Sequence, residues 1–93
     1  MKPIQVLQKP GFKRAYKLLH SNQKLAVNHA VEAIVKDPLL GELKKGDLAD
    51  VYVYKFKCVN QEYLLAYEFD NKHRLLLALG VHENFYRDLK KKK

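Results

Sequence analysis

The sequence predicts an α+β domain in which a helical hairpin packs on an antiparallel sheet. A chain of 93 residues, 47% of them hydrophobic, is enough for one packed domain and too short for two. Apolar residues recur at helical spacing between positions 12 and 36, and from position 51 the spacing changes to the alternation typical of strands. We therefore interpret residues 1–93 as a single domain with its helices before its sheet.

The first half of the chain predicts a short strand over residues 4–8 and then two helices. Pro10 suits the first turn of a helix, because its missing N–H costs little there. One face of this helix, which ends near His20, carries Phe12, Ala15, Tyr16, Leu18 and Leu19. Ser21 or Asn22 can cap the second helix. That helix must stop before Pro38, and its apolar face carries Leu25, Ala26, His29, Ala30, Ala33 and Ile34.

The second half predicts three strands in sequence. After a connection over residues 37–50, strands are expected at 51–58, 62–70 and 74–79, with turns at Asn60-Gln61 and at residues 70–72. Consecutive hairpins make an antiparallel meander, and its continuous apolar last strand is expected to be buried. Gly80 ends that strand, and residues 83–90 are expected to form a short C-terminal helix.

Several function classes are disfavoured by composition. The single cysteine, Cys58, has no internal disulfide partner, and we expect it to be a small residue of a strand. No apolar run approaches the roughly 18 residues of a membrane span, and the N-terminus lacks the apolar core of a signal peptide. We therefore expect a soluble, cytoplasmic protein with no membrane partner. No histidine and acid spacing matches a metal site, so no metal or cofactor is expected.

The positive charge is concentrated at the two ends of the chain. The formal net charge is +8. Residues 1–20 hold five Lys and Arg with no acid, and residues 81–93 hold five against two. Clustered cations favour an anionic partner, either nucleic acid or an acidic protein segment. The alternative is a solvated surface that only aids solubility.

Three stretches carry a resemblance to a known family: Leu43 to Leu48, Glu62 to Phe69, and Leu75 to His82. Together with the order of elements, they resemble the RelE/ParE superfamily of toxins from bacterial type II toxin–antitoxin systems. The segment after Gly80 is most similar to YafQ-type mRNA interferases, which place a histidine two residues after a strand-ending glycine and an aromatic residue four further on. The resemblance implies a ribosome-dependent mRNA endonuclease that is held by an acidic antitoxin.

The resemblance also implies a set of site residues. His82 is the natural proton carrier, because its ordinary pKa lies near neutrality, and Tyr86 can stack on a splayed base. Lys55 and Lys57 share one side of their strand and could hold phosphate charge in the catalytic site. The remaining residues expected to bind RNA are Lys45, Arg87, Lys13, Arg14 and Lys17.

Other interpretations stay open on the residues alone. RelE-type members typically carry an arginine where this chain has Leu64. ParE-type members poison DNA gyrase and cleave nothing, so gyrase inhibition is the main alternative, and a non-toxic RNA-binding module is a third. His82 could be a turn or cap residue, Tyr86 a core residue, and Lys55 with Lys57 a solvated face of the sheet. His29 is expected in the core or at its boundary.

Overall fold

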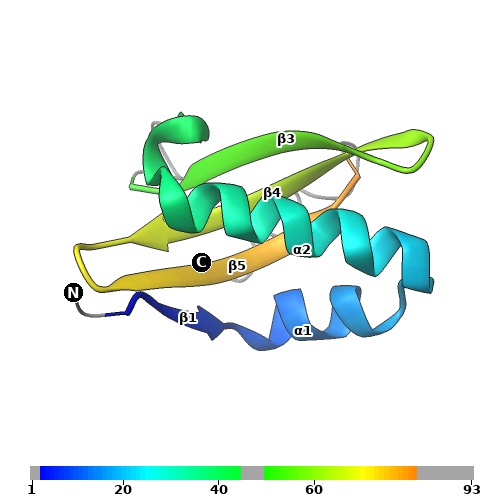
Figure 1. The fold of residues 1–93 in the computed structure, drawn as a ribbon, viewed down its shortest axis with the longest axis horizontal. Helices are drawn as coiled ribbons and strands as arrows, with labels where there is room; N and C mark the ends of the chain where they lie inside the picture. Colours follow the sequence, from blue (N-terminus) through cyan, green and yellow to red (C-terminus); the bar gives the residue numbers. More distant parts are fainter. Residues whose placement is uncertain (1–2, 45–49, 82–93) are drawn as a thin grey trace.

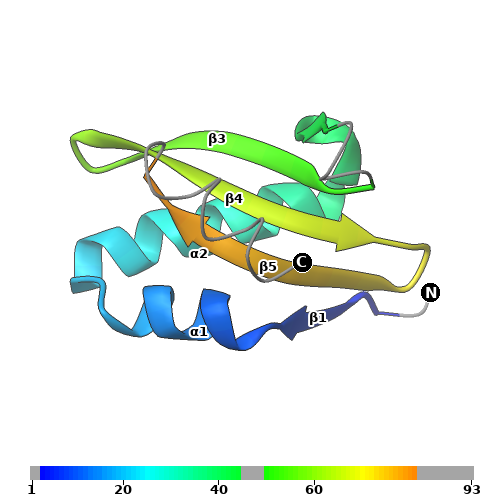
Figure 2. The same cartoon turned by 180° about the vertical axis from the view of Figure 1, so that it is seen from behind.

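Two helices lie on one face of a five-stranded sheet (Figures 1 and 2). The computed structural model describes residues 3–44 and 50–81. The elements are β1 (Gln5–Gln8), α1 (Pro10–Lys17), α2 (Ser21–Lys36), η1 (Pro38–Leu40), β2 (Glu42–Leu43), β3 (Tyr52–Cys58), β4 (Gln61–Phe69) and β5 (His73–Gly80). The predicted α+β class and the helical hairpin on a meander are confirmed. The expected C-terminal helix at 83–90 lies outside the described residues.

The sheet has the order β1-β5-β4-β3-β2. Strands β3, β4 and β5 form the predicted antiparallel meander. β1 joins it by pairing in parallel with β5, from Gln5 opposite His73 to Gln8 opposite Leu76, so the sheet is mixed. Both helices lie in the connection between these parallel strands, which needs a long crossover. β2, at the other edge, was not expected from the sequence.

Several predicted boundaries are corrected by the structure. The residue that precedes the first turn of α2 is His20, and not Ser21 or Asn22; its backbone N–H donates to Oε1 of Gln23 at 2.9 Å. The β3–β4 turn is formed by Val59 and Asn60, one residue earlier than expected. α2 ends at Lys36, ahead of Pro38 as predicted.

The main core lies between the helices and the sheet. Its buried residues are Phe12, Val27, Ala30, Ile34, Cys58, Leu65, Tyr67, Leu76 and Leu79. Three residues assigned to the apolar helix faces lie elsewhere: Leu18 is 84% exposed, Leu25 is 56% exposed, and His29 is exposed rather than in the core or at its boundary. Helical spacing alone therefore gave too broad an apolar stripe.

Cys58 is the small buried strand residue that the sequence predicts. Its thiol is 1% exposed and donates to the carbonyl of Gln23 at 3.6 Å, and burial raises the pKa of the thiol. No helix formed by residues 3–44 and 50–81 is both long and apolar enough to cross a membrane.

Candidate functional site

Lys55 and Lys57 lie side by side on the face of the sheet that is turned away from α1 and α2, here called the second face. Along β3 the side chains alternate, and Tyr54 and Phe56 pack with the helix-side core. Strand alternation therefore places both lysines on the second face, where both are exposed, and Lys57 also borders the pocket beside α2 that is described below. Their Cα atoms are two residue steps apart along the strand, a distance of about 6.5 Å. Two cations at this spacing can contact neighbouring oxygens of one phosphodiester.

The register of the sheet places the end of β5 in one row with Lys55. Lys55 is directly opposite Leu64 on β4, and Leu64 is directly opposite Gly80 on β5. Two strand spacings, about 10 Å, separate Lys55 from Gly80. Gly80, the last residue of β5, thus lies at the same end of the sheet as the lysine pair, and His82 follows it by two residues in the sequence. His82, Tyr86, Lys45 and Arg87 themselves lie outside the described residues.

The floor beside the lysines is apolar. Val51, Val53, Leu64 and Ala66 form a second buried cluster on this face, and Leu64 is 1% exposed. An apolar floor strengthens the interaction of nearby cations with an anion, because fewer water dipoles screen it. At the position where RelE-type members carry an arginine, Leu64 contributes only to this floor.

Two carboxylates border the lysine pair. Glu62 is directly opposite Lys57 on β4. Glu42, on β2, binds Nζ of Lys44 at 2.9 Å. The Lys44 hydrogen bond and charge, with a smaller contribution from Lys55, hold the pKa of the Glu42 carboxyl below its usual range. The positive charge of Lys55 therefore reaches the neighbouring edge of the sheet.

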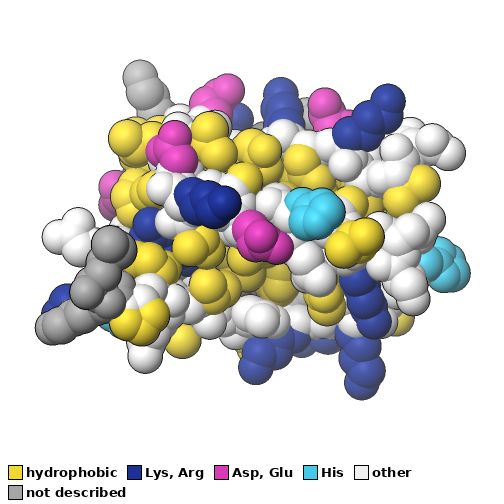
Figure 3. Space-filling view, in the orientation of Figure 1, with side chains coloured by type: hydrophobic (Ala, Val, Ile, Leu, Met, Phe, Trp, Pro, Cys, Tyr) yellow, Lys and Arg dark blue, Asp and Glu magenta, His cyan; other side chains and the backbone are white. Residues whose placement is uncertain are grey.

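The basic residues of α1 form a separate surface. Lys13, Arg14 and Lys17 are all exposed on this helix, and Figure 3 shows Lys and Arg side chains projecting along the lower rim, where α1 lies in Figure 1. α1 packs on β5 and belongs to the helical layer. The structure thus separates these cations from the lysine pair by the thickness of the sheet and the width of β4.

A pocket that the sequence did not predict opens between α2 and the edge of β3. It has a volume of about 220 Å³ and is lined by Ala26, His29, Ala30, Tyr54, Phe56 and Lys57. The two alanines, four residues apart, leave the space between helix and strand unfilled, and this small-residue pair is the signal the sequence offered. Within residues 3–44 and 50–81, no three His, Cys, Asp or Glu side chains gather as metal ligands would.

Comparison with known structures shows the same fold. A chain of the intact E. coli RelBE toxin–antitoxin complex superposes with a TM-score of 0.68 at 18% identity, covering 86% of this chain and 98% of that one. The YoeB/ParE toxin from Agrobacterium tumefaciens superposes with a TM-score of 0.71 at 12% identity, covering 85% of this chain and 99% of that one. A chain of the RelBE2 toxin–antitoxin complex from Mycobacterium tuberculosis superposes with a TM-score of 0.71 at 19% identity, covering 86% of this chain and 99% of that one.

The family is shown by the sequence itself. A search of curated proteins found no match to this chain. The sequence model of the family described as "ParE-like toxin of type II bacterial toxin-antitoxin system" matches residues 6–90. With nearly the whole domain matched and the fold shared with toxins of such systems, this chain belongs to the ParE-like toxins of type II bacterial toxin–antitoxin systems.

Proposed function

We propose that this toxin is a metal-independent endoribonuclease that cuts mRNA on the ribosome. The observation that carries the proposal is the row from Lys55 through Leu64 to Gly80. Lys55 is in register with the end of β5, two residues before His82 in the sequence, and Lys57 lies two residues further along the same face of β3. A proton carrier and a pair of phosphate-binding cations are what cleavage of RNA by its own 2′-hydroxyl requires.

The reaction is an internal transfer at phosphorus. The 2′ oxygen attacks the adjacent phosphorus, the O2′–P bond forms, and the P–O5′ bond breaks. The products are a 2′,3′-cyclic phosphate and a free 5′-hydroxyl. A base accepts the 2′-hydroxyl proton and an acid gives a proton to the leaving 5′ oxygen, so no oxidant or second substrate is consumed. His82 serves as a proton carrier, because the ordinary pKa of imidazole lies close to 6.5.

Lys55 and Lys57 stabilise the charge that builds on phosphorus. The non-bridging oxygens become more negative as the fifth bond forms, and fixed ammonium groups interact with this state more strongly than with the diester. The apolar floor of Val53 and Leu64 amplifies the effect. Tyr86 stacks on the base beside the cut, and Lys45 and Arg87 hold flanking phosphates.

The basic face of α1 binds RNA away from the cut. Lys13, Arg14 and Lys17 are exposed on the helical layer, so they contact the ribosomal RNA that surrounds the message. This division gives the two clusters different roles. The basic residues of α1 set the affinity for RNA, while Lys55 and Lys57 set the rate of cleavage.

Cleavage is tested with purified toxin in a reconstituted translation reaction, read by primer extension on one translated message. The wild type should give site-specific cuts, and Lys55→Ala/Lys57→Ala should cut about 100-fold or more slowly. His82→Ala should be similarly impaired. Lys36→Ala/Lys72→Ala is the matched control, since it removes two exposed lysines elsewhere and should retain wild-type cleavage. Equal cutting by the lysine-pair variant would contradict the proposed site.

One observation favours a second candidate function. Leu64 is buried and apolar where RelE-type enzymes typically carry an arginine, so this chain lacks one cation of that nuclease pattern. The alternative is inhibition of DNA gyrase by binding alone. Intact message together with toxin-dependent loss of supercoiling by purified gyrase would establish it and overturn the nuclease.

Both functions require a partner antitoxin. The unbalanced charge of +8 favours an acidic one, which would fold on the toxin surface and cover its cations. Co-expression of the acidic protein encoded beside the toxin gene should restore growth, whereas the toxin alone should arrest it. A chain that is harmless when expressed alone would contradict the toxin activity itself.

A further inference from the structure

The outer edge of β1 is open to another strand. β1 pairs with β5 and stands at one end of the sheet order β1-β5-β4-β3-β2. Among residues 3–44 and 50–81, no strand lies on its other side. In Figures 1 and 2 it runs along the margin of the sheet, and α1 continues from its end along the same margin. All four residues of β1 are exposed. An edge of this kind is a template for pairing with another chain.

The hydrogen bonds to β5 identify which main-chain groups of β1 face outward. The N–H groups of Gln5 and Lys9 donate to carbonyls on the β5 side, at 2.8 and 2.9 Å. In a parallel pair this direction repeats every second residue. The N–H and C=O groups of Val6, the N–H and C=O groups of Gln8 and the C=O of Ile4 therefore point away from the sheet. Donors and acceptors are thus presented at regular strand spacing.

The edge of β1 carries no charge, which is unusual on this chain. Residues 3–8 contain no Lys, Arg, Asp or Glu, although the formal net charge of the chain is +8. Two copies of so basic a chain repel each other, and an uncharged edge is where they can approach most closely. An acidic segment would find no cation on it. Val6 is 38% exposed and Leu7 is 47% exposed, so the edge also offers apolar area for burial.

The strand is complementary to a second copy of itself. With a two-fold axis at Val6, two antiparallel copies of β1 place Val6 directly opposite the partner's Val6. Outward-facing residues that lie opposite each other exchange N–H and C=O groups. The two valines therefore bond to each other, and the N–H of Gln8 reaches the carbonyl of the partner's Ile4. Lys9 lies opposite the partner's Pro3, so no two charges oppose each other between residues 3 and 9.

We propose that the edge of β1 is a homodimer interface, at which two copies of the toxin pair about Val6 and join their five-stranded sheets into one. Each copy uses its own β1, so the two-fold axis closes the assembly at two chains. Cross-strand neighbours point to the same face, so both copies present Lys55 and Lys57 on one side, uncovered by the dimer. The contact is a short strand pair, so the dimer is weak and forms at high concentration.

The test measures self-association of the full chain by sedimentation velocity, from about 10 μM to about 1 mM. The wild type should shift from monomer to dimer as its concentration rises. The shift should be larger at high salt, because screening weakens the repulsion between two chains of charge +8. Over the same range, amide hydrogen exchange measured by NMR should slow at Val6 and Gln8. The N–H of Leu7, which faces β5, should exchange at an unchanged rate.

Charge exchange at position 6 tests the register. Val6→Lys and Val6→Glu should each dimerise at least about fivefold more weakly than the wild type, because like charges would lie directly opposite each other. Mixed in equal amounts, the two variants should associate as the wild type does, since opposite charges then meet. Leu25→Lys, at an exposed leucine of α2, is the matched control and should dimerise within about twofold of the wild type. Circular dichroism that matches the wild type confirms that each variant has folded.

Several outcomes would overturn the proposal. These are a chain that stays monomeric throughout the range, a Val6→Lys variant that dimerises like the wild type, an association that weakens with salt, or a mixture of the two variants that gains nothing. Slow exchange at Val6 already at the lowest concentration would assign the edge to another segment of the same chain. The proposed nuclease stands or fails separately, because message cleavage is measured with other variants and does not depend on the dimer.

Discussion

The guanidinium of Arg74, on β5, donates from Nε to the main-chain carbonyl of Ile34 in the last turn of α2, at 3.1 Å. Its Nη2 donates to Val35 at 3.0 Å, and Nη1 donates to the carbonyls of Asp70 and His73. Arg74 is 5% exposed, so a single buried cation joins the C-terminal end of α2 to the β4–β5 turn. The negative end of the helix dipole favours a cation there.

Replacement of Arg74 should therefore destabilise the fold strongly. Arg74→Met keeps much of the side-chain volume but leaves these carbonyls without their donors, at a cost of about 2–4 kcal/mol in the free energy of unfolding. Urea unfolding followed by circular dichroism measures it. Arg14→Met, on the exposed face of α1, is the control and should change stability by less than about 0.5 kcal/mol. A small loss for Arg74→Met would show that water replaces the guanidinium.

The hydroxyl of Tyr67 joins the centre of the sheet to the segment after α2. It donates to the carbonyl of Pro38 at 2.6 Å and accepts the N–H of Gly41 at 3.0 Å. Tyr67→Phe should cost about 1–3 kcal/mol, because both groups lose their partner. Tyr63→Phe is the matched control, since no hydrogen bond joins its hydroxyl to the described residues. Thermal unfolding should separate the two variants clearly.

Gly41 is required by the close approach of the same ring. A Cβ at this position would lie 2.5 Å from the Tyr67 hydroxyl and 3.0 Å from the adjacent ring carbons. Gly41→Ala should therefore displace the ring and destabilise the protein. The loss should be smaller when Tyr67→Phe is already present, because the nearest atom is then absent. If the stability losses of Gly41→Ala and Tyr67→Phe were additive in this double-mutant cycle, the clash between the new Cβ and the Tyr67 hydroxyl would not be the cause of the destabilisation.

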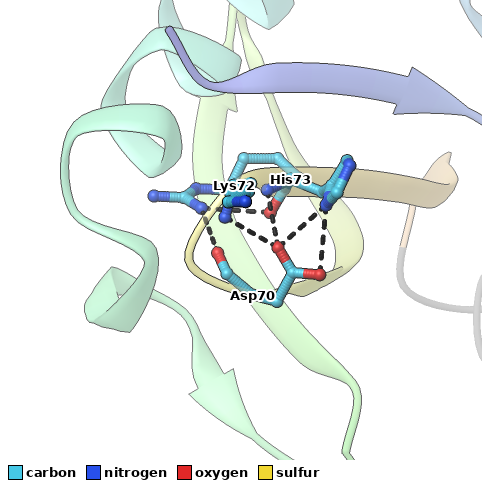
Figure 4. A network of polar contacts seen from close by, with 4 residues as sticks. Asp70, Lys72 and His73 are labelled. Carbon is cyan, nitrogen blue, oxygen red and sulfur yellow. Dashed lines mark hydrogen bonds and ion pairs between the residues drawn. The ribbon is translucent and has the colours of Figure 1, made fainter. Parts of the chain in front are cut away.

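The β4–β5 turn predicts a pH dependence of stability. Figure 4 shows Asp70 facing the backbone of Lys72 and the ring of His73; its Oδ1 accepts the Lys72 N–H at 2.7 Å and lies 2.9 Å from Nδ1 of His73. The backbone hydrogen bond from Lys72 and then the His73 side chain lower the pKa of Asp70. A lowered pKa in the folded state adds stability above the unfolded pKa, and this stability is lost as pH falls through the folded value.

Asp70→Asn should remove that part of the pH dependence. The wild type should lose stability relative to the variant as the pH falls from about 5 to about 3, since an aspartate in the unfolded chain titrates near 4. Unfolding midpoints measured across this range give the difference curve. Glu32→Gln, an exposed acid on α2, should leave the wild-type curve unchanged in shape. Parallel curves for Asp70→Asn and wild type would contradict the role of the turn.

The basic face of α1 predicts a salt dependence of RNA binding. In Lys13→Gln/Arg14→Gln/Lys17→Gln, the slope of log affinity against log salt for an oligouridine should fall by about 2, because each lost phosphate contact contributes about 0.7. Cleavage per bound complex should stay near the wild-type rate. Lys36→Gln/Lys72→Gln controls for net charge and should largely retain the slope. An unchanged slope in the triple variant would place RNA binding elsewhere.

Local patterns predicted much of this fold. Alternation along β3 correctly puts Lys55 and Lys57 on one face, because side chains in a strand must alternate whatever surrounds it. The end of α2 before Pro38 follows equally directly from backbone sterics. Such features depend on neighbouring residues only, so the sequence is sufficient to predict them.

Other features depend on contacts between distant residues. Glu42–Leu43 is too short to show alternation, and it is a strand only because β3 lies beside it. The apolar spacing of α2 could not show that Leu25 and His29 lie beyond the area that the sheet covers. The sequence assigned Lys13 to RNA binding and Lys55 to the catalytic site but could not show how they are placed, and the topology sets them on different layers. The row from Lys55 to Gly80 likewise required the register of three strands.

The parallel pairing of β1 with β5 has a consequence for how the toxin is made. Gln5 leaves the ribosome well before its partner His73, which follows it by 68 residues in the sequence. Closing so long a loop is slow, because chain entropy is lost before the pairing compensates for it. During synthesis, β1 must wait until β5 has emerged. The sheet is therefore completed only after β5 has been synthesised, so no shorter nascent chain can hold the complete five-stranded sheet.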